Sequence, residues 1–217
     1  MRPIEKCYLC GVTENLTNDH LPPKAFFPPK FRENLITVRC CRKCNEGFSM
    51  DDEAMLIWLT SVAAINEKGL WVLRNRVAPI LKKKTKLRSR VKEHIKIETF
   101  QFPTGQVRLP LSYMPDARGD RFMVRLTKGF LRKFYPDYDY SNDTFTAQCA
   151  KPFNLAEWTH WQNIMPFVAH THDSRGDGVI DFWHKLPSDD DMGAWVFLFY
   201  RAALFVVWQD RKAQSTS

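Results

Sequence analysis

The chain has 217 residues, of which 44% are hydrophobic, 13% aromatic and 26% charged, so it can bury a core and is not globally disordered. No run of about eighteen uncharged apolar residues occurs, which argues against a membrane span. The first residues, MRPIEKCYLC, lack the apolar core of a secretory signal. We therefore expect a cytoplasmic protein without membrane partners.

The net charge of +8 lies in the first hundred residues. Residues 1–50 contain 8 Lys or Arg against 5 Asp or Glu, residues 51–100 contain 11 against 6, and residues 101–217 contain 13 against 13. One-sided positive charge is typical of proteins that bind a polyanion, most often nucleic acid. A solvated basic surface would explain the same charge equally well.

The first fifty residues predict a strand, a long loop, a second strand and then a helix. The strands are expected over residues 16–20 and 35–38, and three of the four residues in the second are β-branched. Four prolines keep the loop between the strands extended.

A longer helix is predicted from residue 51 to residue 77, with a break at Gly69 and an end or kink at Pro79. The run KKKTKLRSRVK follows at residues 82–92, with seven basic residues and no acid. Beyond it we expect strands near residues 95–102, 106–111, 144–150, 179–185, 194–200 and 203–208, and helices near 121–134 and 154–167. The last two strands should form a hairpin. The predicted fold class is α+β, a mixed sheet with antiparallel strands and helices packed on it.

Five of the six cysteines lie in the first 44 residues. Because disulfides are rare inside cells, clustered thiols indicate a metal site. Two Cys-x-x-Cys pairs would supply four thiolates to a tetrahedral zinc ion, a closed site that is structural rather than catalytic. These ligands are Cys7, Cys10, Cys41 and Cys44. Cys40 could replace a ligand but is expected to pack as a small apolar side chain, and Cys149 is expected in the core.

A zinc ion held by both pairs would also draw polar side chains together. Asp19 and Asn45 offer the hard oxygen ligands that Mg²⁺ prefers. His20 follows Asp19 on the strand and points to its other face, and an imidazole titrates near neutrality, so it can act as a base. Asn34 precedes the second strand. Ordinary turn and cap roles for Asp19, Asn34 and Asn45 are the alternative interpretation.

The pattern CYLC…NDH…ENLITV…CCRKCN, residues 7–50, resembles the HNH endonuclease family, whose core is the ββα-metal motif. The resemblance implies that His20 is the general base and that Asp19 and Asn45 bind a catalytic divalent ion, Mg²⁺ or Mn²⁺. It implies that Asn34 holds the loop through backbone hydrogen bonds, and that the four-cysteine site binds structural zinc. The implied substrate is nucleic acid, with DNA expected.

The sequence departs from the family where many members carry a lysine after the last motif position, since Glu46 to Ser49 stand there. Phosphate contacts are therefore expected from other basic residues, namely Arg42, Lys43, Lys82, Lys83, Lys84 and Lys86.

This interpretation divides the chain into an HNH nuclease domain over residues 1–60, a helix and basic connector over 61–93, and an accessory α+β domain of unknown role over 94–217. The alternative function is a non-catalytic zinc module that binds nucleic acid or protein. It explains the cysteines and the charge but not the matching positions of Asp19, His20, Asn34 and Asn45.

A second cluster of possible metal ligands, two histidines and an aspartate, lies at residues 170–173. This segment is expected to be a polar loop rather than a metal site.

Overall fold

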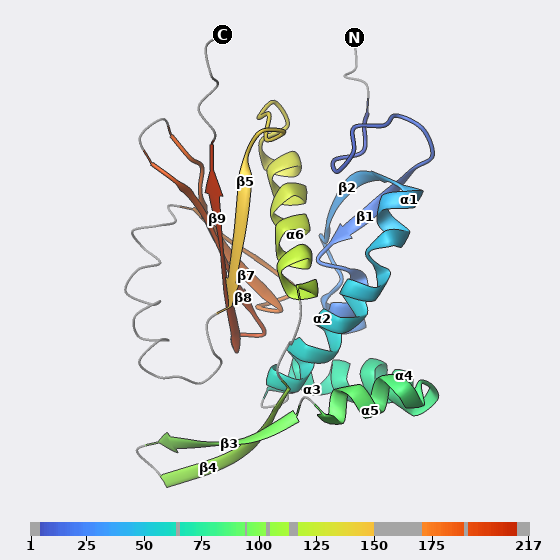
Figure 1. Ribbon diagram of the computed structural model, residues 1–217, viewed down its shortest axis with the longest axis vertical. Coiled ribbons are helices and arrows are strands. Elements are labelled where there is room, and N and C mark those ends of the chain that lie inside the picture. The colour runs from blue at the N-terminus through green and yellow to red at the C-terminus, as the bar shows by residue number, and fades with distance from the viewer. Residues whose placement is uncertain are drawn as a thin grey trace.

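The computed structural model describes residues 5–63, 66–93, 95–102, 105–112, 117–149, 171–188 and 191–211. The strands are β1 Leu16–Leu21, β2 Ile36–Cys41, β3 Ile95–Phe102, β4 Gly105–Ser112, β5 Thr144–Cys149, β6 Thr171–Arg175, β7 Ile180–Lys185, β8 Gly193–Phe199 and β9 Ala203–Asp210. The helices are α1 Arg42–Gly47, α2 Ser49–Val62, α3 Glu67–Val72, α4 Ala78–Lys83, α5 Thr85–Glu93 and α6 Arg118–Phe134, with short helical turns at Lys24–Phe26 and Pro29–Phe31 and a wide helical turn at Leu73–Val77. Helices and antiparallel sheets together confirm the predicted α+β class (Figure 1). The expectation of one mixed sheet was wrong, because the described strands form three separate sheets in which every pair is antiparallel.

The largest sheet has five antiparallel strands in the order β5-β9-β8-β7-β6. The predicted β8–β9 hairpin is present, with Phe199 opposite Ala203. Helix α6 lies along the sheet (Figure 1) because its apolar residues recur every four positions and so share one face. Two of them, Phe122 and Phe130, are fully buried, and the Phe130 ring centre lies 4.5 Å from that of Phe182 on β7.

One apolar core includes residues from all three segments into which the sequence was divided. Phe26, in the loop after β1, stacks on Phe122 of α6 with ring centres 5.5 Å apart. Trp58 of α2 meets the ring of Phe205 of β9 edge-on at 5.4 Å. The loop and α2 therefore pack on the same helix and sheet.

The break in the predicted long helix lies before Gly69, not at it. Helix α2 ends at Val62 and α3 begins at Glu67, so Gly69 is inside α3. A Cβ atom at this position would lie 2.3 Å from the carbonyl oxygen of Ala63, so glycine permits α3 to approach the end of α2. Pro79 lies in the first turn of α4, directly after the wide helical turn Leu73–Val77.

Two expectations about the C-terminal strands were wrong. Residues 171–175 form β6, an edge strand paired with β7, where a polar loop was expected. Pairing with β7 supplies the backbone hydrogen bonds, so a polar sequence is tolerated at the edge of the sheet. Cys149 was expected in the core but is exposed, because it ends the edge strand β5. The predicted helix near 154–167 and His170 lie outside the described residues.

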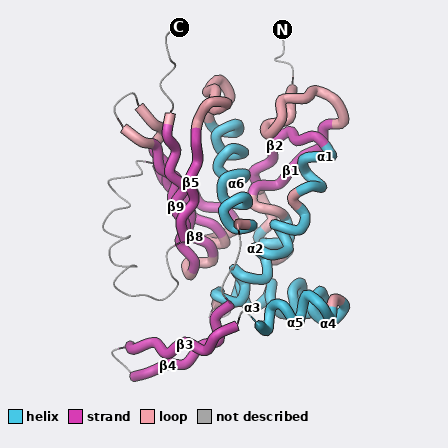
Figure 2. The backbone as a smooth tube through the Cα atoms, viewed as in Figure 1, coloured by secondary structure: helices cyan, strands magenta, loops and turns pink. Residues whose placement is uncertain are grey.

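The β3–β4 hairpin has the predicted extent and projects from one end of the molecule (Figure 2). The described helices include none that is long and apolar enough to cross a bilayer.

Candidate functional site

The candidate site is built on the β1–β2 hairpin and the helix that follows it. The two strands are antiparallel, with Leu16 opposite Cys41 and His20 opposite Thr37. Helix α1 begins directly after β2, so the predicted order of strand, loop, strand and helix is present. Cys41 caps α1, because its Sγ accepts a hydrogen bond from the backbone N–H of Cys44 at 3.4 Å.

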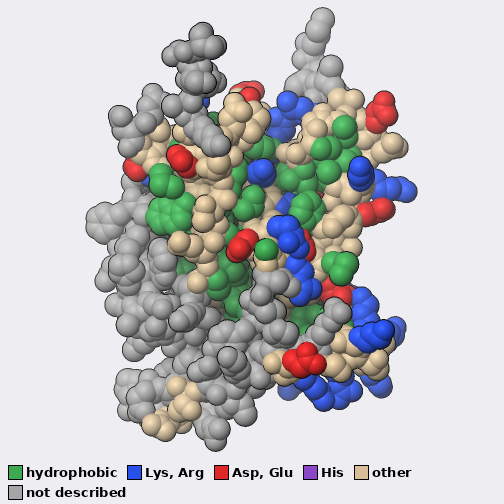
Figure 3. Space-filling model, in the orientation of Figure 1, with side chains coloured by type: hydrophobic (Ala, Val, Ile, Leu, Met, Phe, Trp, Pro, Cys, Tyr) green, Lys and Arg blue, Asp and Glu red, His purple; other side chains and the backbone are tan. Residues whose placement is uncertain are grey.

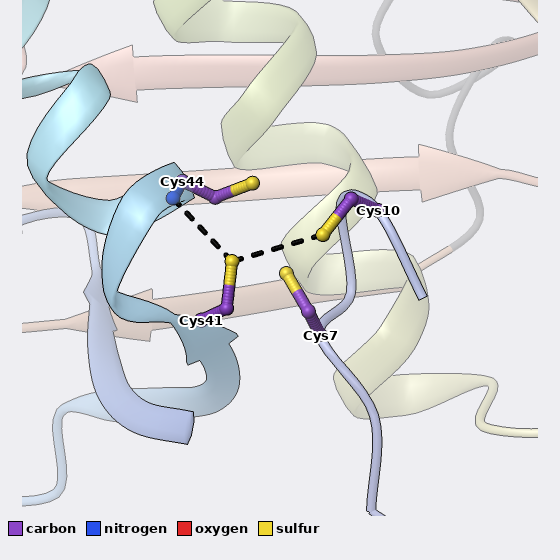
Figure 4. Close-up of side chains that lie close together, drawn as sticks. All are labelled: Cys7, Cys10, Cys41 and Cys44. Carbon is purple, nitrogen blue, oxygen red and sulfur yellow. Dashed lines mark hydrogen bonds between the residues drawn. The ribbon is translucent and has the colours of Figure 1, made fainter. Parts of the chain in front are cut away.

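Four cysteines from two segments converge beside this hairpin (Figure 4). The sulfur atoms of Cys7, Cys10, Cys41 and Cys44 all lie within 4.8 Å of one another, and those of Cys10 and Cys41 are 3.7 Å apart. Four sulfurs about 2.3 Å from a central zinc ion would be about 3.8 Å apart. The cluster could therefore hold a metal ion such as zinc, with the ligands predicted from the cysteine spacing.

The thiols of this cluster influence one another's ionisation. Burial raises the pKa of Cys7, but hydrogen bonds from backbone groups of Cys41, Cys10 and Leu9 outweigh burial and lower the pKa to about 6. The pKa of Cys44 is raised, first by burial and then by the neighbouring thiols. A bound cation would remove this conflict, since it favours the thiolate at every ligand.

Cys40 lies outside the four-sulfur cluster. It is fully buried, and its Sγ lies 3.9 Å from that of Cys7. Successive residues of a strand face opposite sides, so Cys40 and Cys41 diverge. The prediction that Cys40 packs as a small apolar side chain is confirmed.

Asp19 is buried, with 5% of its surface exposed, and lies in a polar cluster that the sequence analysis did not predict. Tyr8 donates a hydrogen bond from Oη to the Asp19 carboxylate at 2.8 Å. Burial raises the pKa of Asp19, and the charge of Arg125 on α6 and the Tyr8 hydrogen bond oppose this shift. Arg125, itself 2% exposed, forms an ion pair with Asp52 of α2.

The only sequence sign of this polar cluster is an arginine within the apolar stripe of α6. The guanidinium of Arg125 lies 4.9 Å from the ring centre of Phe48, which separates α1 from α2. The cluster therefore joins the hairpin, the α1–α2 junction and α6.

His20 is half-buried at the end of β1, next to Asp19. Burial and then the charge of Lys24 lower its pKa, and the Asp19 charge only partly opposes them. The imidazole is therefore neutral at pH 7 and has a lone pair that can accept a proton.

Asn45 and Asn34 differ in their relation to the hairpin. Asn45 is half-buried on α1, and its Nδ2 donates to Oγ1 of Thr17 at 3.2 Å. Thr17 lies two residues before Asp19 on β1, so Asn45 reaches the same strand face as Asp19. Asn34 is exposed in the turn before β2, with a left-handed φ of 56°.

A second, divalent ion would need oxygen ligands, and Asp19 and Asn45 provide the right donor types. Within the described part of the chain, the four cysteines are the only close group of three or more Cys, His, Asp or Glu. Asp19 and Asn45 would therefore need water or a phosphate to complete such a site.

The predicted phosphate-binding residues are exposed on two surfaces. Arg42 and Lys43 lie on α1. The Nε atom of Arg42 lies 3.9 Å from a carboxylate oxygen of Glu46, so this arginine has an acidic partner. Lys82, Lys83 and Lys86 lie on α4 and α5, where Lys and Arg side chains gather (Figure 3). Lys84, which lies between Lys83 and Lys86, forms an ion pair with Glu53 at 2.7 Å.

Comparison of the chain with known protein families, with curated proteins and with solved structures found no match.

Proposed function

We propose that this protein is a metal-dependent endonuclease of the HNH type, which hydrolyses phosphodiester bonds in nucleic acid, with DNA as the expected substrate. The proposal is supported by the four-cysteine cluster beside the hairpin and helix, by the position of His20 next to Asp19 on β1, and by the hydrogen bond from Asn45 of α1 to the same strand. Strand, loop, strand and helix occur in the order that the resemblance requires.

In the proposed mechanism, His20 accepts the proton of a water molecule that attacks the phosphorus in line with the leaving oxygen. Asp19 and Asn45 would hold Mg²⁺ or Mn²⁺, which when bound supplies Lewis-acid stabilisation of the phosphate and the leaving oxygen. Tyr8 positions the Asp19 carboxylate through its hydrogen bond. Asn34 would keep the role that the resemblance implies at the end of the loop, where its backbone is left-handed.

The test is plasmid nicking with Mg²⁺ or Mn²⁺ by the wild type and by His20→Ala. Loss of the base should reduce the rate by about 10²–10⁴-fold without unfolding the protein. His172→Ala is the matched control, because His172 lies on the edge strand β6, stacked on Trp183 at 4.7 Å. Equal nicking by His20→Ala and the wild type would remove His20 from the mechanism.

The second candidate is a zinc module that binds nucleic acid or protein without cleaving it. The burial of Asp19 and its hydrogen bond with Tyr8 favour this reading, because an ion would have to reach a carboxylate that is already engaged. An open hollow of about 1000 Å³ beside the cysteines, lined in part by Arg42 and Lys43, offers a binding surface. A cleavage panel distinguishes the nuclease from the non-catalytic module. It tests supercoiled, linear and single-stranded DNA and RNA, each with Mg²⁺ and with Mn²⁺. A non-catalytic module would bind these substrates but cleave none of them.

A further inference from the structure

A cavity of about 510 Å³ lies where three segments of the chain meet. Its walls come from residues 6–11, from helix α6, and from residues 136–141 in the loop after α6. The loop is fastened to the first wall, because Oη of Tyr140 donates a hydrogen bond to the carbonyl of Tyr8 at 2.6 Å. The volume lies in the range of about 300–1000 Å³ that is typical of small-molecule sites.

Three basic side chains from two of these segments line the cavity. Lys6 directly precedes Cys7, whereas Lys128 and Arg132 are four residues apart on α6 and so share one face of the helix. Nη1 of Arg132 donates to the carbonyl of Pro136 at 2.8 Å, which holds the guanidinium beside the loop. Among the described residues, none of these three cations forms an ion pair. The cavity therefore offers positive charge that no acid of the described chain has taken up.

The helix dipole explains only one of these cations. Arg132 lies in the last turn of α6, where a positive side chain is favoured by the negative end of the dipole. Lys128 precedes that turn, and its ammonium group lies 5.2 Å from the ring centre of Phe145 on β5. Lys6 belongs to a different segment altogether. Their convergence on one cavity indicates an anionic ligand.

Two carboxylates on the loop wall show that the ligand is not a simple polyanion. Asp137 and Asp139 both line the cavity and are exposed. Asp139 accepts a hydrogen bond from the backbone N–H of Ser141 at 3.0 Å, and within the described residues Asp137 forms no ion pair. Carboxylates repel a continuous phosphate backbone, but they accept hydrogen bonds from hydroxyl and amino groups. The wall therefore favours a ligand that carries both an anion and such donors.

Two tyrosines of the same loop provide aromatic surface. The Tyr138 hydroxyl donates to Asp143 at 2.8 Å, and the Tyr140 hydroxyl is used by Tyr8, so the rings are what remain for a ligand. Arg211 lies 5.8 Å from the ring centre of Tyr138 and covers one face of it. Aromatic rings of this kind stack on nucleobases.

We propose that this cavity binds a mononucleotide. The three cations bind its phosphate, Asp137 accepts hydrogen bonds from a ribose hydroxyl or a base amino group, and a tyrosine ring packs against the base. The site goes beyond the proposed function, because neither His20, Asp19 nor Asn45 lines the cavity and binding requires no cleavage.

The test is calorimetric titration of the full-length protein with adenosine, guanosine, cytidine and uridine 5′-monophosphate and with inorganic phosphate. Lys6→Gln together with Lys128→Gln should raise the dissociation constant of the nucleotide that binds by about tenfold, because hydrogen bonds to a charged phosphate are lost. Lys92→Gln together with Lys133→Gln is the charge-matched control. These lysines are exposed on α5 and α6 and line no part of the cavity, so affinity should not change.

Asp137→Asn distinguishes a nucleotide site from a phosphate site. Loss of the carboxylate should weaken nucleotide binding, because an acceptor is weakened, yet strengthen binding of inorganic phosphate, because a repulsive charge is removed. Tighter binding of both ligands by this variant would overturn the nucleotide assignment.

Three further results would overturn the proposal. They are a wild type that binds none of the four nucleotides, an equal loss of affinity in the two lysine double variants, and a 5′-phosphorylated DNA oligonucleotide that binds this site more tightly than any mononucleotide. His20→Ala should bind the nucleotide as tightly as the wild type. Nicking that is unchanged in His20→Ala would therefore refute the proposed catalysis and leave the nucleotide site standing.

Discussion

Strands β1 and β8 have similar lengths but are held in place by different interactions. All seven residues of β8 are buried, in the middle of the five-stranded sheet. Of the six residues of β1, only Asp19 and Leu21 are buried, and one of these is a carboxylate. Strand β8 is thus stabilised almost wholly by apolar burial, whereas the hairpin combines the burial of Leu21, Ile36 and Val38 in the common core with the cysteine cluster and polar contacts. A ligand or metal can therefore change the stability of the hairpin far more than that of the sheet.

The largest expected effect is the loss of the metal site, which should unfold the hairpin and leave the five-stranded sheet folded. Cys41→Ser removes a thiolate and the cap of α1, and it should abolish metal binding and unfold the hairpin, because binding of a structural metal contributes to folding outright. Zinc stoichiometry and amide hydrogen exchange measure the effect, with fast exchange expected in β1 and β2 and slow exchange retained in β8. Cys149→Ser, an exposed cysteine of β5, is the matched control and should keep its metal. Full metal binding by Cys41→Ser would contradict the four-cysteine site.

The reverse experiment weakens the sheet. Phe130→Ala removes a fully buried ring that contacts Phe182 and Phe197, and should cost about 3–5 kcal/mol of unfolding free energy. Urea denaturation measures the loss, and zinc stoichiometry below the transition should not change. Phe145→Ala, on the edge strand β5, should cost less because that side chain is only half-buried. If Phe130→Ala loses its metal in the absence of urea, the two regions are not independently stabilised.

A smaller effect should appear as a pH dependence of the sheet. Burial lowers the pKa of His184 on β7 to about 4, below its ordinary value of 6.5, and Oη of Tyr135 lies 2.6 Å from its Nε2. Between these two values the unfolded chain binds more protons, so the stability present above pH 6.5 is lost as the pH falls. We expect a loss of roughly 2 kcal/mol between about pH 7 and about pH 5.

Urea denaturation of the wild type and of His184→Gln isolates this contribution. The comparison is needed because Asp52 acts in the opposite direction: burial raises its pKa to about 6, so its protonation favours the folded state as the pH falls. The glutamine variant should lack the destabilisation in acid that the wild type shows. The same pH dependence in both proteins would contradict a neutral, buried His184.

Local patterns predict much of this fold. Residues that lie close together in the sequence are enough to predict three features: the apolar strands β8 and β9, the apolar stripe of α6, and the metal site of the four cysteines. Interactions between distant residues leave no such pattern. The Asp52–Arg125 ion pair and the Tyr8–Asp19 hydrogen bond join segments whose proximity follows only from the packing of α6 on the hairpin and α2. Likewise, β6 is a strand because β7 lies beside it, and the break before α3 is set by the approach of Gly69 to Ala63.

The buried guanidinium of Arg125 makes excision of the hairpin unit from this chain costly. A fragment ending near residue 60 would contain Asp19, Asp51 and Asp52 but not Arg121 or Arg125, the α6 arginines that pair with the last two. It would also expose Phe26 and Trp58, whose aromatic neighbours come from α6 and β9. We therefore expect such a fragment to aggregate even with zinc present, so attempts to transplant this unit into another protein should include α6.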